Sequence, residues 1–353
     1  MFCYSITGGE DIQMSEVTMI GLDLAKRVFH LHGARADGSV AFRKKLSRAQ
    51  LLTFLSGQPH CLVAMEACAT AHGWGREIAK LGHTVRLIPP AYVKPFVKRQ
   101  KNDAADAEAI VEAASRPTMR FVEVKTEEQQ AHAMLFRTRQ MFVRQRTQLI
   151  NALRGHLAEH GVIAPQGPAY IRTLTSALQD KSLGLPQIVR ELGQVYADQI
   201  AVIGVRIAAL DLKMRTSARC AETTRRLQTM PGVGHVTAVA LEAFAPPMNS
   251  FRRGRDFAAW LGLVPRQHSS CGKQRLGKTS KMGQRDIRRL LIIGAMSMVR
   301  ATLRRGTAEG TWLARMLARK PRILVATALA NKMARGLWAM MTKQEEYRNP
   351  ALT

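Results

Sequence analysis

The clearest shortage in this 353-residue sequence is of acidic side chains. Lys and Arg total 53 against 26 Asp and Glu, which gives a formal net charge of +27 and a pI near 10.9. A surplus of this size favours a polyanionic partner, because it spreads a positive potential over the surface. The composition therefore indicates a protein that binds nucleic acid, and charge alone does not distinguish DNA from RNA.

Long apolar runs and paired cysteines are also missing. The longest apolar stretches, 290–299 and 323–330, are far shorter than the ~20 residues that a membrane-spanning helix needs. There is no basic-then-apolar leader, so we expect no membrane partner. The 5 cysteines are scattered, with neither zinc-ligand spacing nor a disulfide framework, which indicates a reducing, cytoplasmic location.

The N-terminal third has the pattern of an α/β domain. Residues 1–16 are polar and aperiodic, and we expect a disordered tail there. A domain is predicted over 17–124, in which apolar runs indicate strands and periodic segments indicate helices. The strands are expected at 17–24, 28–34, 40–46, 61–65 and 84–88. Because strands come first and then alternate with helices, the sheet is predicted to be partly parallel.

Four acidic residues of this domain form a candidate metal site. Asp23 and Glu66 each end an apolar strand, where ligands gather in such sheets. Asp103 and Asp106 are three residues apart in the first turn of a predicted helix, so they share one face. Like charges held together repel unless a cation lies between them, and Mg²⁺ prefers oxygen ligands. The alternative is that the two aspartates only decorate a helix N-terminus, where the macrodipole favours acids.

The middle and the end of the chain read as helical. Residues 125–228 contain two long helical segments, at 126–160 and 188–227, whose irregular heptads leave open an antiparallel hairpin or a dimerising coiled coil. A mainly helical domain is predicted over 229–344, and residues 345–353 are expected to form a disordered tail. The domain over 229–344 begins with Pro231-Gly232-Val233-Gly234, which resembles a helix-hairpin-helix turn. The backbone N–H groups of such a turn can bind a phosphate.

A polar segment of this last domain is dense in cations. We expect it to be a flexible loop that follows a phosphate backbone and adds salt-sensitive affinity. The nucleic-acid contacts that it predicts are Arg266, Lys273, Arg275, Lys278, Lys281 and Arg285. Ser269 and Ser270 lie within it, yet a serine hydroxyl is a poor nucleophile without a base or a metal. No Ser-His-Asp arrangement is evident nearby, and sequence chemistry alone favours a loop-shaping role for both serines.

Several motifs together resemble one family of bacterial transposases, the insertion-sequence one-ten family. In the N-terminal half they are Gly21-Leu22-Asp23-Leu24-Ala25-Lys26, Met65-Glu66-Ala67-Cys68 and Lys101-Asn102-Asp103-Ala104-Ala105-Asp106-Ala107. In the C-terminal half they are Gly262-Leu263-Val264-Pro265, Ser269-Ser270 and Gly277-Lys278-Thr279-Ser280-Lys281-Met282-Gly283. The resemblance spans nearly the whole chain, with both halves in the family's order.

The resemblance implies a RuvC-like domain of RNase H fold in which Asp23, Glu66, Asp103 and Asp106 hold Mg²⁺. It also implies a C-terminal transposase domain with a DNA-attacking serine. Ser270 matches that position, and Ser269 is the second register. Related sequences tend to read Ser-Ser-Gly-Gly, so Cys271 departs from the pattern.

The function implied is that of a DNA recombinase that excises and inserts its own element. Its expected partners are donor and target DNA, a structured guide (bridge) RNA, and further copies of the chain in a dimer or tetramer. In that assembly one subunit's serine domain completes another's acidic site. The competing hypothesis is a metal-dependent RuvC-like nuclease or junction resolvase, in which water replaces serine as the nucleophile; a non-catalytic architectural binder is a second.

Overall fold

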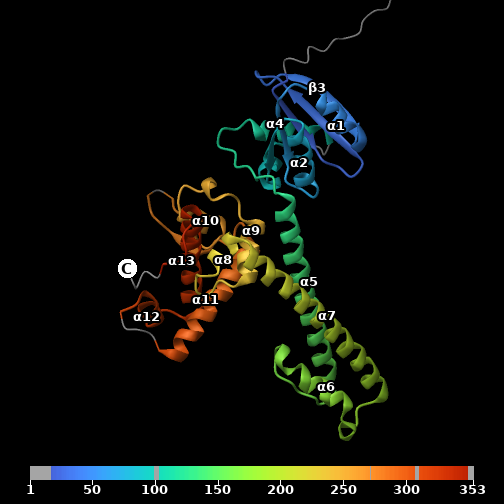
Figure 1. The fold of residues 1–353 in the computed structure, drawn as a ribbon, viewed down its shortest axis with the longest axis vertical. Helices are drawn as coiled ribbons and strands as arrows, with labels where there is room; N and C mark the ends of the chain where they lie inside the picture. The colour runs from blue at the N-terminus through green and yellow to red at the C-terminus, as the bar shows by residue number, and fades with distance from the viewer. Residues whose placement is uncertain (1–16, 99–102, 271, 307–309, 349–353) are drawn as a thin grey trace, which may run out of the picture. The chain divides into compact units, whose positions relative to one another are not determined.

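The computed structural model describes residues 17–98, 103–270, 272–306 and 310–348 (Figure 1). The chain divides into two compact units, residues 1–127 and 128–353. The tail predicted over 1–16 lies outside the described residues, and so does Cys271.

The N-terminal unit is built on a mixed five-stranded sheet. Its strands are β1 (Met19–Asp23), β2 (Val28–Ala34), β3 (Val40–Ser47), β4 (Leu62–Glu66) and β5 (Thr84–Ile88), in the order β3-β2-β1-β4-β5. The first three form an antiparallel meander, and β4 and β5 run parallel to β1. The predicted α/β layer with a partly parallel sheet is therefore confirmed.

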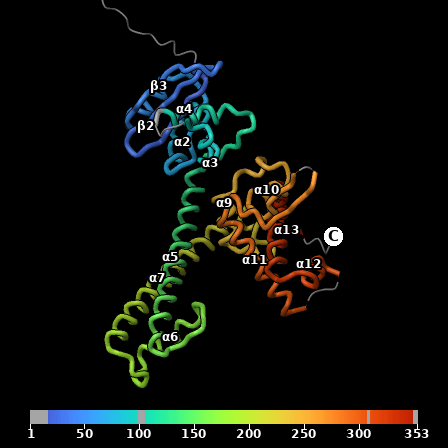
Figure 2. Tube along the Cα trace, turned by 180° about the vertical axis from the view of Figure 1, so that it is seen from behind, coloured from blue at the N-terminus to red at the C-terminus, as the bar shows by residue number. Residues whose placement is uncertain are grey.

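Helices cover both faces of this sheet (Figures 1 and 2). Helices α1 (Arg48–Ser56) and α2 (Ala71–Lys80) cover the face that buries Ile20, Leu22 and Met65. A capping box between Ser47 and Gln50 starts α1. The short α3 (Pro90–Val93) and η2 (Lys94–Phe96) lead toward α4 (Asp103–Ala114), which covers the other face. The alternation of side chains along each strand explains the two separate cores.

The second unit begins with a helical hairpin. Helix α5 (Glu127–Ala158) runs antiparallel to α7 (Gln187–Cys220), and η3 (Pro168–Tyr170), α6 (Ile171–Gln179) and η4 (Lys181–Leu183) connect them. Leu153 and Ile200 share an apolar core with Leu174 of α6. Nearer the other end, Arg139 forms a two-point ion pair with Asp211, with N–O distances of 2.5 and 3.2 Å. The two long helices thus pack on each other within one chain.

The rest of this unit is a helical bundle around one large core. Its helices are α8 (Glu222–Leu227), α9 (His235–Phe244), η5 (Met248–Ser250), α10 (Gly254–Trp260), α11 (Arg285–Arg305), α12 (Trp312–Leu317) and α13 (Arg322–Lys343). The prediction of a mostly helical remainder is confirmed. The cation-rich segment is instead a β-hairpin, made of β6 (Pro265–Gln267) and β7 (Leu276–Thr279), where a flexible loop was expected.

Tyr347 lies within the C-terminal tail predicted over 345–353, and it contacts the bundle. The Tyr347 backbone N–H donates to Thr229 Oγ1 at 2.9 Å, and its ring packs half-buried against the core of the bundle. Tyr347 is therefore held against the bundle, because an aromatic ring there gains by covering apolar surface, and residues 349–353 lie outside the described residues. Among the described helices, none is long and apolar enough to cross a membrane.

Candidate functional site: an acidic cluster and a serine hairpin

Two of the predicted acidic residues close neighbouring strands. Strands β1 and β4 are adjacent and parallel, with Leu22 opposite Met65, so Asp23 and Glu66 follow at the same end of the sheet. Because side chains alternate between the faces, both carboxylates project to the face that α4 covers. The arrangement is that of a ligand site at the carboxyl ends of parallel strands.

Helix α4 approaches this face closely enough to add a third acid. A Cβ atom on Gly21 would lie 2.3 Å from the carbonyl oxygen of Ala107 and 2.6 Å from Val111 Cγ2. Only a glycine admits the helix at this distance, since real Cβ atoms essentially never come within 3.0 Å of another heavy atom. Asp106 precedes Ala107, so the contact carries its half-buried side chain toward the strand ends.

The electrostatics show that the three carboxylates share one environment. Burial raises the pKa of Glu66 above its ordinary value, and the negative charges of Asp23 and Asp106 raise it further. The thiol of Cys68 lies in the same field, because burial, Glu66 and Asp23 all raise its pKa. The raised pKa favours the protonated thiol, and the same charges make the site unfavourable for any additional negative charge.

The fourth acid, Asp103, is the first residue of α4, and its side chain lies outside the described part of the structure. Within the described part, no group of three His, Cys, Asp or Glu side chains is arranged to hold a metal ion. The donor chemistry nevertheless fits a hard divalent cation, since the converging groups are carboxylates and one has a raised pKa. Asp23, Glu66, Asp103 and Asp106 are the residues that would hold it.

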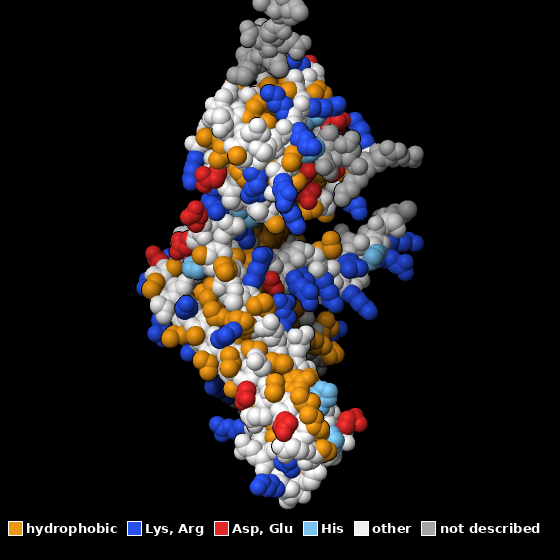
Figure 3. Space-filling model, turned by 90° about the vertical axis from the view of Figure 1, so that its right-hand side faces the viewer, with side chains coloured by type: hydrophobic (Ala, Val, Ile, Leu, Met, Phe, Trp, Pro, Cys, Tyr) orange, Lys and Arg blue, Asp and Glu red, His pale blue; other side chains and the backbone are white. Residues whose placement is uncertain are grey.

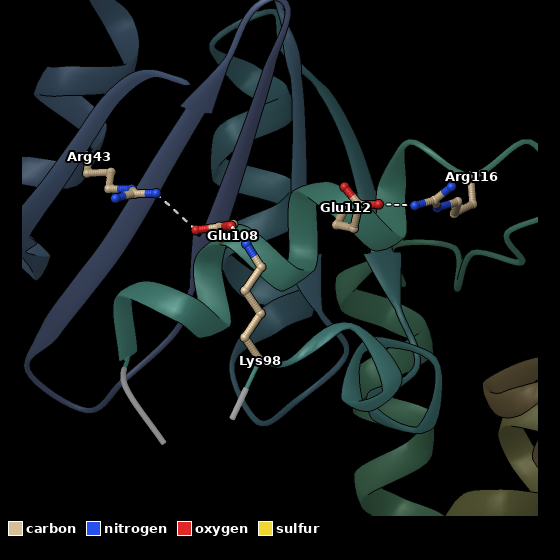
Figure 4. Close-up of polar contacts among 5 residues, drawn as sticks. All are labelled: Arg43, Lys98, Glu108, Glu112 and Arg116. Atoms are coloured by element: carbon tan, nitrogen blue, oxygen red, sulfur yellow. Dashed lines mark hydrogen bonds and ion pairs between the residues drawn. The ribbon is translucent and has the colours of Figure 1, made fainter. Parts of the chain in front are cut away.

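Helix α4 also carries two ion-paired glutamates, Glu108 and Glu112, that the sequence analysis did not single out. The Glu108 carboxylate accepts hydrogen bonds from Arg43 of β3 at 3.0 Å and from Lys98 at 2.5 Å (Figure 4). The Lys98 hydrogen bond and the nearby cations lower the pKa of Glu108. One turn further along, Arg116 pairs with Glu112. Arg43 and Glu108 are 65 residues apart in sequence, which explains why sequence reasoning missed Glu108.

Ser269 and Ser270 lie at the exposed tip of the β6–β7 hairpin. Ser269 Oγ accepts a hydrogen bond from the Arg275 backbone N–H at 3.2 Å, so this hydroxyl is engaged in shaping the tip. The Ser270 carbonyl accepts one from the Lys273 N–H at 3.0 Å. Both serines are thus carried by a turn with defined backbone pairing.

The six predicted nucleic-acid contacts follow the same hairpin. Arg266 lies in β6, Lys278 in β7, and Arg285 begins α11. All six side chains are exposed, namely those of Arg266, Lys273, Arg275, Lys278, Lys281 and Arg285. Figure 3 shows how strongly Lys and Arg outnumber Asp and Glu on the face it presents. Exposed cations gathered on and beside one hairpin favour a polyanionic partner.

Comparisons with known families agree with both halves of this arrangement. A model of DEDD-type transposases, described as "Transposase", matches residues 20–161, which include the acidic cluster. A second, described as "Transposase IS116/IS110/IS902 family", matches residues 224–309, which include the serine hairpin. The protein is therefore a transposase, an enzyme that transfers phosphoryl groups in DNA.

Whole-chain relatives extend this class to a family. A "probable family 20 transposase" of Pseudomonas aeruginosa is 47% identical over 94% of this chain and 99% of its own length. The transposases for insertion sequence elements IS1328 of Yersinia enterocolitica and IS1111A of Coxiella burnetii are 40% and 38% identical, over 94% and 95% of this chain and 98% and 92% of theirs. The chain belongs to the IS116/IS110/IS902 family of insertion-sequence transposases.

Proposed function

We propose that this transposase cuts and rejoins DNA through Ser270, at a phosphodiester next to Mg²⁺ held by Asp23, Glu66, Asp103 and Asp106. The observation that carries the proposal is geometric: Asp23 and Glu66 end the adjacent parallel strands β1 and β4, and the close contact of Gly21 with α4 brings Asp106 toward them. Burial and the charges of Asp23 and Asp106 accordingly raise the pKa of Glu66. Carboxylates gathered in this way are unfavourable at neutral pH without a cation to offset their repulsion. The sheet order and the acids at its strand ends support a RuvC-like domain of RNase H type.

The proposed reaction proceeds by two exchanges at phosphorus. Ser270 Oγ forms a bond to the phosphorus while the bond from phosphorus to a deoxyribose oxygen breaks; the serine proton leaves to solvent, and the departing oxygen takes up a proton. The bound cation would stabilise charge on the entering and leaving oxygens. A deoxyribose hydroxyl of the second DNA then attacks the phosphoserine, which releases Ser270 and joins the strands. The serine domain of one subunit serves the acidic site of another.

The nucleic-acid contacts are proposed at two places. The exposed cations of the serine hairpin would follow the DNA backbone. The turn between α8 and α9 would act as a helix-hairpin-helix, in which backbone N–H groups at the start of α9 bind a phosphate. Gly232 and Gly234 of this turn line a cavity of about 410 Å³ together with Arg139 and Arg289. Donor DNA, target DNA and a structured guide RNA are the proposed partners, and sequencing the nucleic acid that copurifies with the protein tests the RNA.

The subunit contact is proposed on α7. Six large aliphatic side chains of this 34-residue helix are exposed, at positions three, four or seven residues apart, so they form one stripe: Ile188, Leu192, Val195, Val202, Val205 and Leu212. An apolar stripe of this length rarely faces water in a monomer. We expect Leu192→Arg with Val205→Arg to lower the mass measured by light scattering, and Ile163→Arg, at an exposed loop position, to leave it unchanged.

Covalent capture tests the reaction directly. With Mg²⁺ and a DNA containing the element's end, wild-type protein should form an adduct that resists denaturant, and Ser270→Ala should not. If Ser270→Ala still cleaves at the wild-type rate and forms no adduct, water is the nucleophile and the protein is a nuclease. Asp103→Asn should lose strand transfer while it retains DNA affinity; an architectural binder would lose nothing.

A further inference from the structure

The base of the serine hairpin, formed by residues 261–264 before β6 and 280–283 after β7, is held together by backbone hydrogen bonds and by one close contact. The Ser280 N–H donates to the Val264 carbonyl at 2.8 Å, and the Lys281 N–H donates to the Gly262 carbonyl at 3.2 Å. A Cβ atom on Gly262 would lie 2.1 Å from the carbonyl oxygen of Met282. A side chain at position 262 would not fit against the segment that leaves the hairpin, so the two segments meet backbone to backbone at this level.

Arg288 anchors this base to α11. It lies one turn into α11, and its Nη1 atom donates to the Leu261 carbonyl and to the Met282 carbonyl, both at 2.9 Å. These carbonyls belong to the chain entering the hairpin and to the chain leaving it. The Arg288 side chain is half-buried, and burial lowers its pKa. One guanidinium therefore ties both ends of the hairpin to the helix behind it.

The neighbours of Arg288 on α11 behave differently. Arg285 and Arg289 are exposed, and the sequence presents all three as one run of cations. From α13, Asn331 Nδ2 adds a hydrogen bond to the Leu263 carbonyl at 3.1 Å, so a second helix holds the entering strand. The base is thus fixed to two helices of the bundle core, and the tip projects from it.

We propose that Arg288 is a positioning residue, which holds the hairpin so that Ser270 reaches the scissile phosphate, and that it does not bind phosphate itself. The proposal rests on the assignment of Ser270 as the nucleophile. A planar guanidinium can satisfy two carbonyls at once, whereas the single ammonium of a lysine on a flexible stem holds neither in a fixed direction. A nucleophile displaced by ~1 Å loses about 100-fold in rate.

Arg288→Lys and Arg288→Gln test the proposal against a phosphate-binding role. Both should slow adduct formation at saturating DNA by about 100-fold, and both should keep the DNA dissociation constant within about twofold of wild type. Arg285→Gln and Arg289→Gln are the matched controls. Each should weaken DNA binding and reduce by about 1 the slope of the logarithm of the binding constant against the logarithm of the salt concentration. If Arg288→Lys reacts at the wild-type rate, or Arg288→Gln weakens binding as the controls do, the proposal is wrong.

Hydrogen exchange separates this proposal from the assignment of Ser270. In a Ser270→Ala background, Arg288→Gln should speed exchange of the Ser280 and Lys281 amides at least tenfold, while amides within α13 stay protected. Unchanged exchange at these two amides overturns the anchor whatever the nucleophile is. Faster exchange together with normal cleavage by Ser270→Ala would support the anchor and refute Ser270 as the nucleophile. Loss of protection in α13 as well would mean global unfolding and would also overturn the local role.

Discussion

The close contact between Gly21 and α4 makes a sharp prediction. In Gly21→Ala the new Cβ would lie 2.3 Å from the carbonyl oxygen of Ala107, so α4 must retreat by about 1 Å to restore an ordinary contact of 3.4 Å. Overpacking of this kind costs about 1–3 kcal/mol of unfolding free energy, because a backbone atom cannot rotate away. The same shift moves Asp106 away from Asp23 and Glu66, and misplacement by ~1 Å lowers catalytic rates by about 100-fold.

Urea denaturation and single-turnover strand cleavage with Mg²⁺ measure these two effects. Gly73→Ala is the matched control, since a Cβ on this α2 residue would meet no atom within 4 Å. We expect the control to gain about 0.5–1 kcal/mol in stability and to cleave normally. A Gly21→Ala protein as stable and as active as wild type would refute the proposed path from helix packing to the acidic site.

Two further predictions concern the two units separately. The folded state binds a proton at Glu66 more tightly than the unfolded chain does, because the pKa of Glu66 is raised on folding. The stability that this group contributes is therefore fully present below its ordinary pKa and is lost as the pH rises through the raised pKa. Glu66→Gln should therefore stabilise the metal-free protein at pH 7 and not below pH ~4, and a variant less stable at pH 7 would contradict this. Phe136 is buried, and its ring meets that of Phe244 edge-on with 5.3 Å between the centroids. Phe136→Ala should therefore lower the free energy of unfolding by about 3–5 kcal/mol, and a loss below about 1 kcal/mol in urea denaturation would show that α5 and α9 are not tightly packed there.

Much of the N-terminal unit follows from local pattern. An apolar run that ends in an acid predicts both the strand and the placement of Asp23 and Glu66, because burial and alternation act over a few residues. The role of Gly21 does not follow, since the atoms that exclude a side chain belong to Ala107 and Val111, more than eighty residues away. Distant packing of this kind leaves no local signal.

The serine hairpin shows a different limit of sequence reasoning. Strands β6 and β7 have only 3 and 4 residues, and all but Thr279 are exposed, so neither apolar runs nor alternation announces them. Arg288 is equally hidden, because helical periodicity tells which side chains share a face and not which carbonyls they reach. Composition predicts a cationic surface here, whereas the inward turn of one arginine depends on the hairpin base.

Helix α4 shows how the fold sorts acids that the sequence presents alike. Asp106 and Glu108 are two residues apart, and at 3.6 residues per turn they point to nearly opposite sides of the helix. On one side, Lys98 and Arg43 lower the pKa of Glu108. On the other, Asp106 helps to raise the pKa of Glu66. Cations that already neutralise Glu108 leave the Asp106 side electronegative in a strongly basic chain, which is the condition that a divalent cation needs in order to bind there.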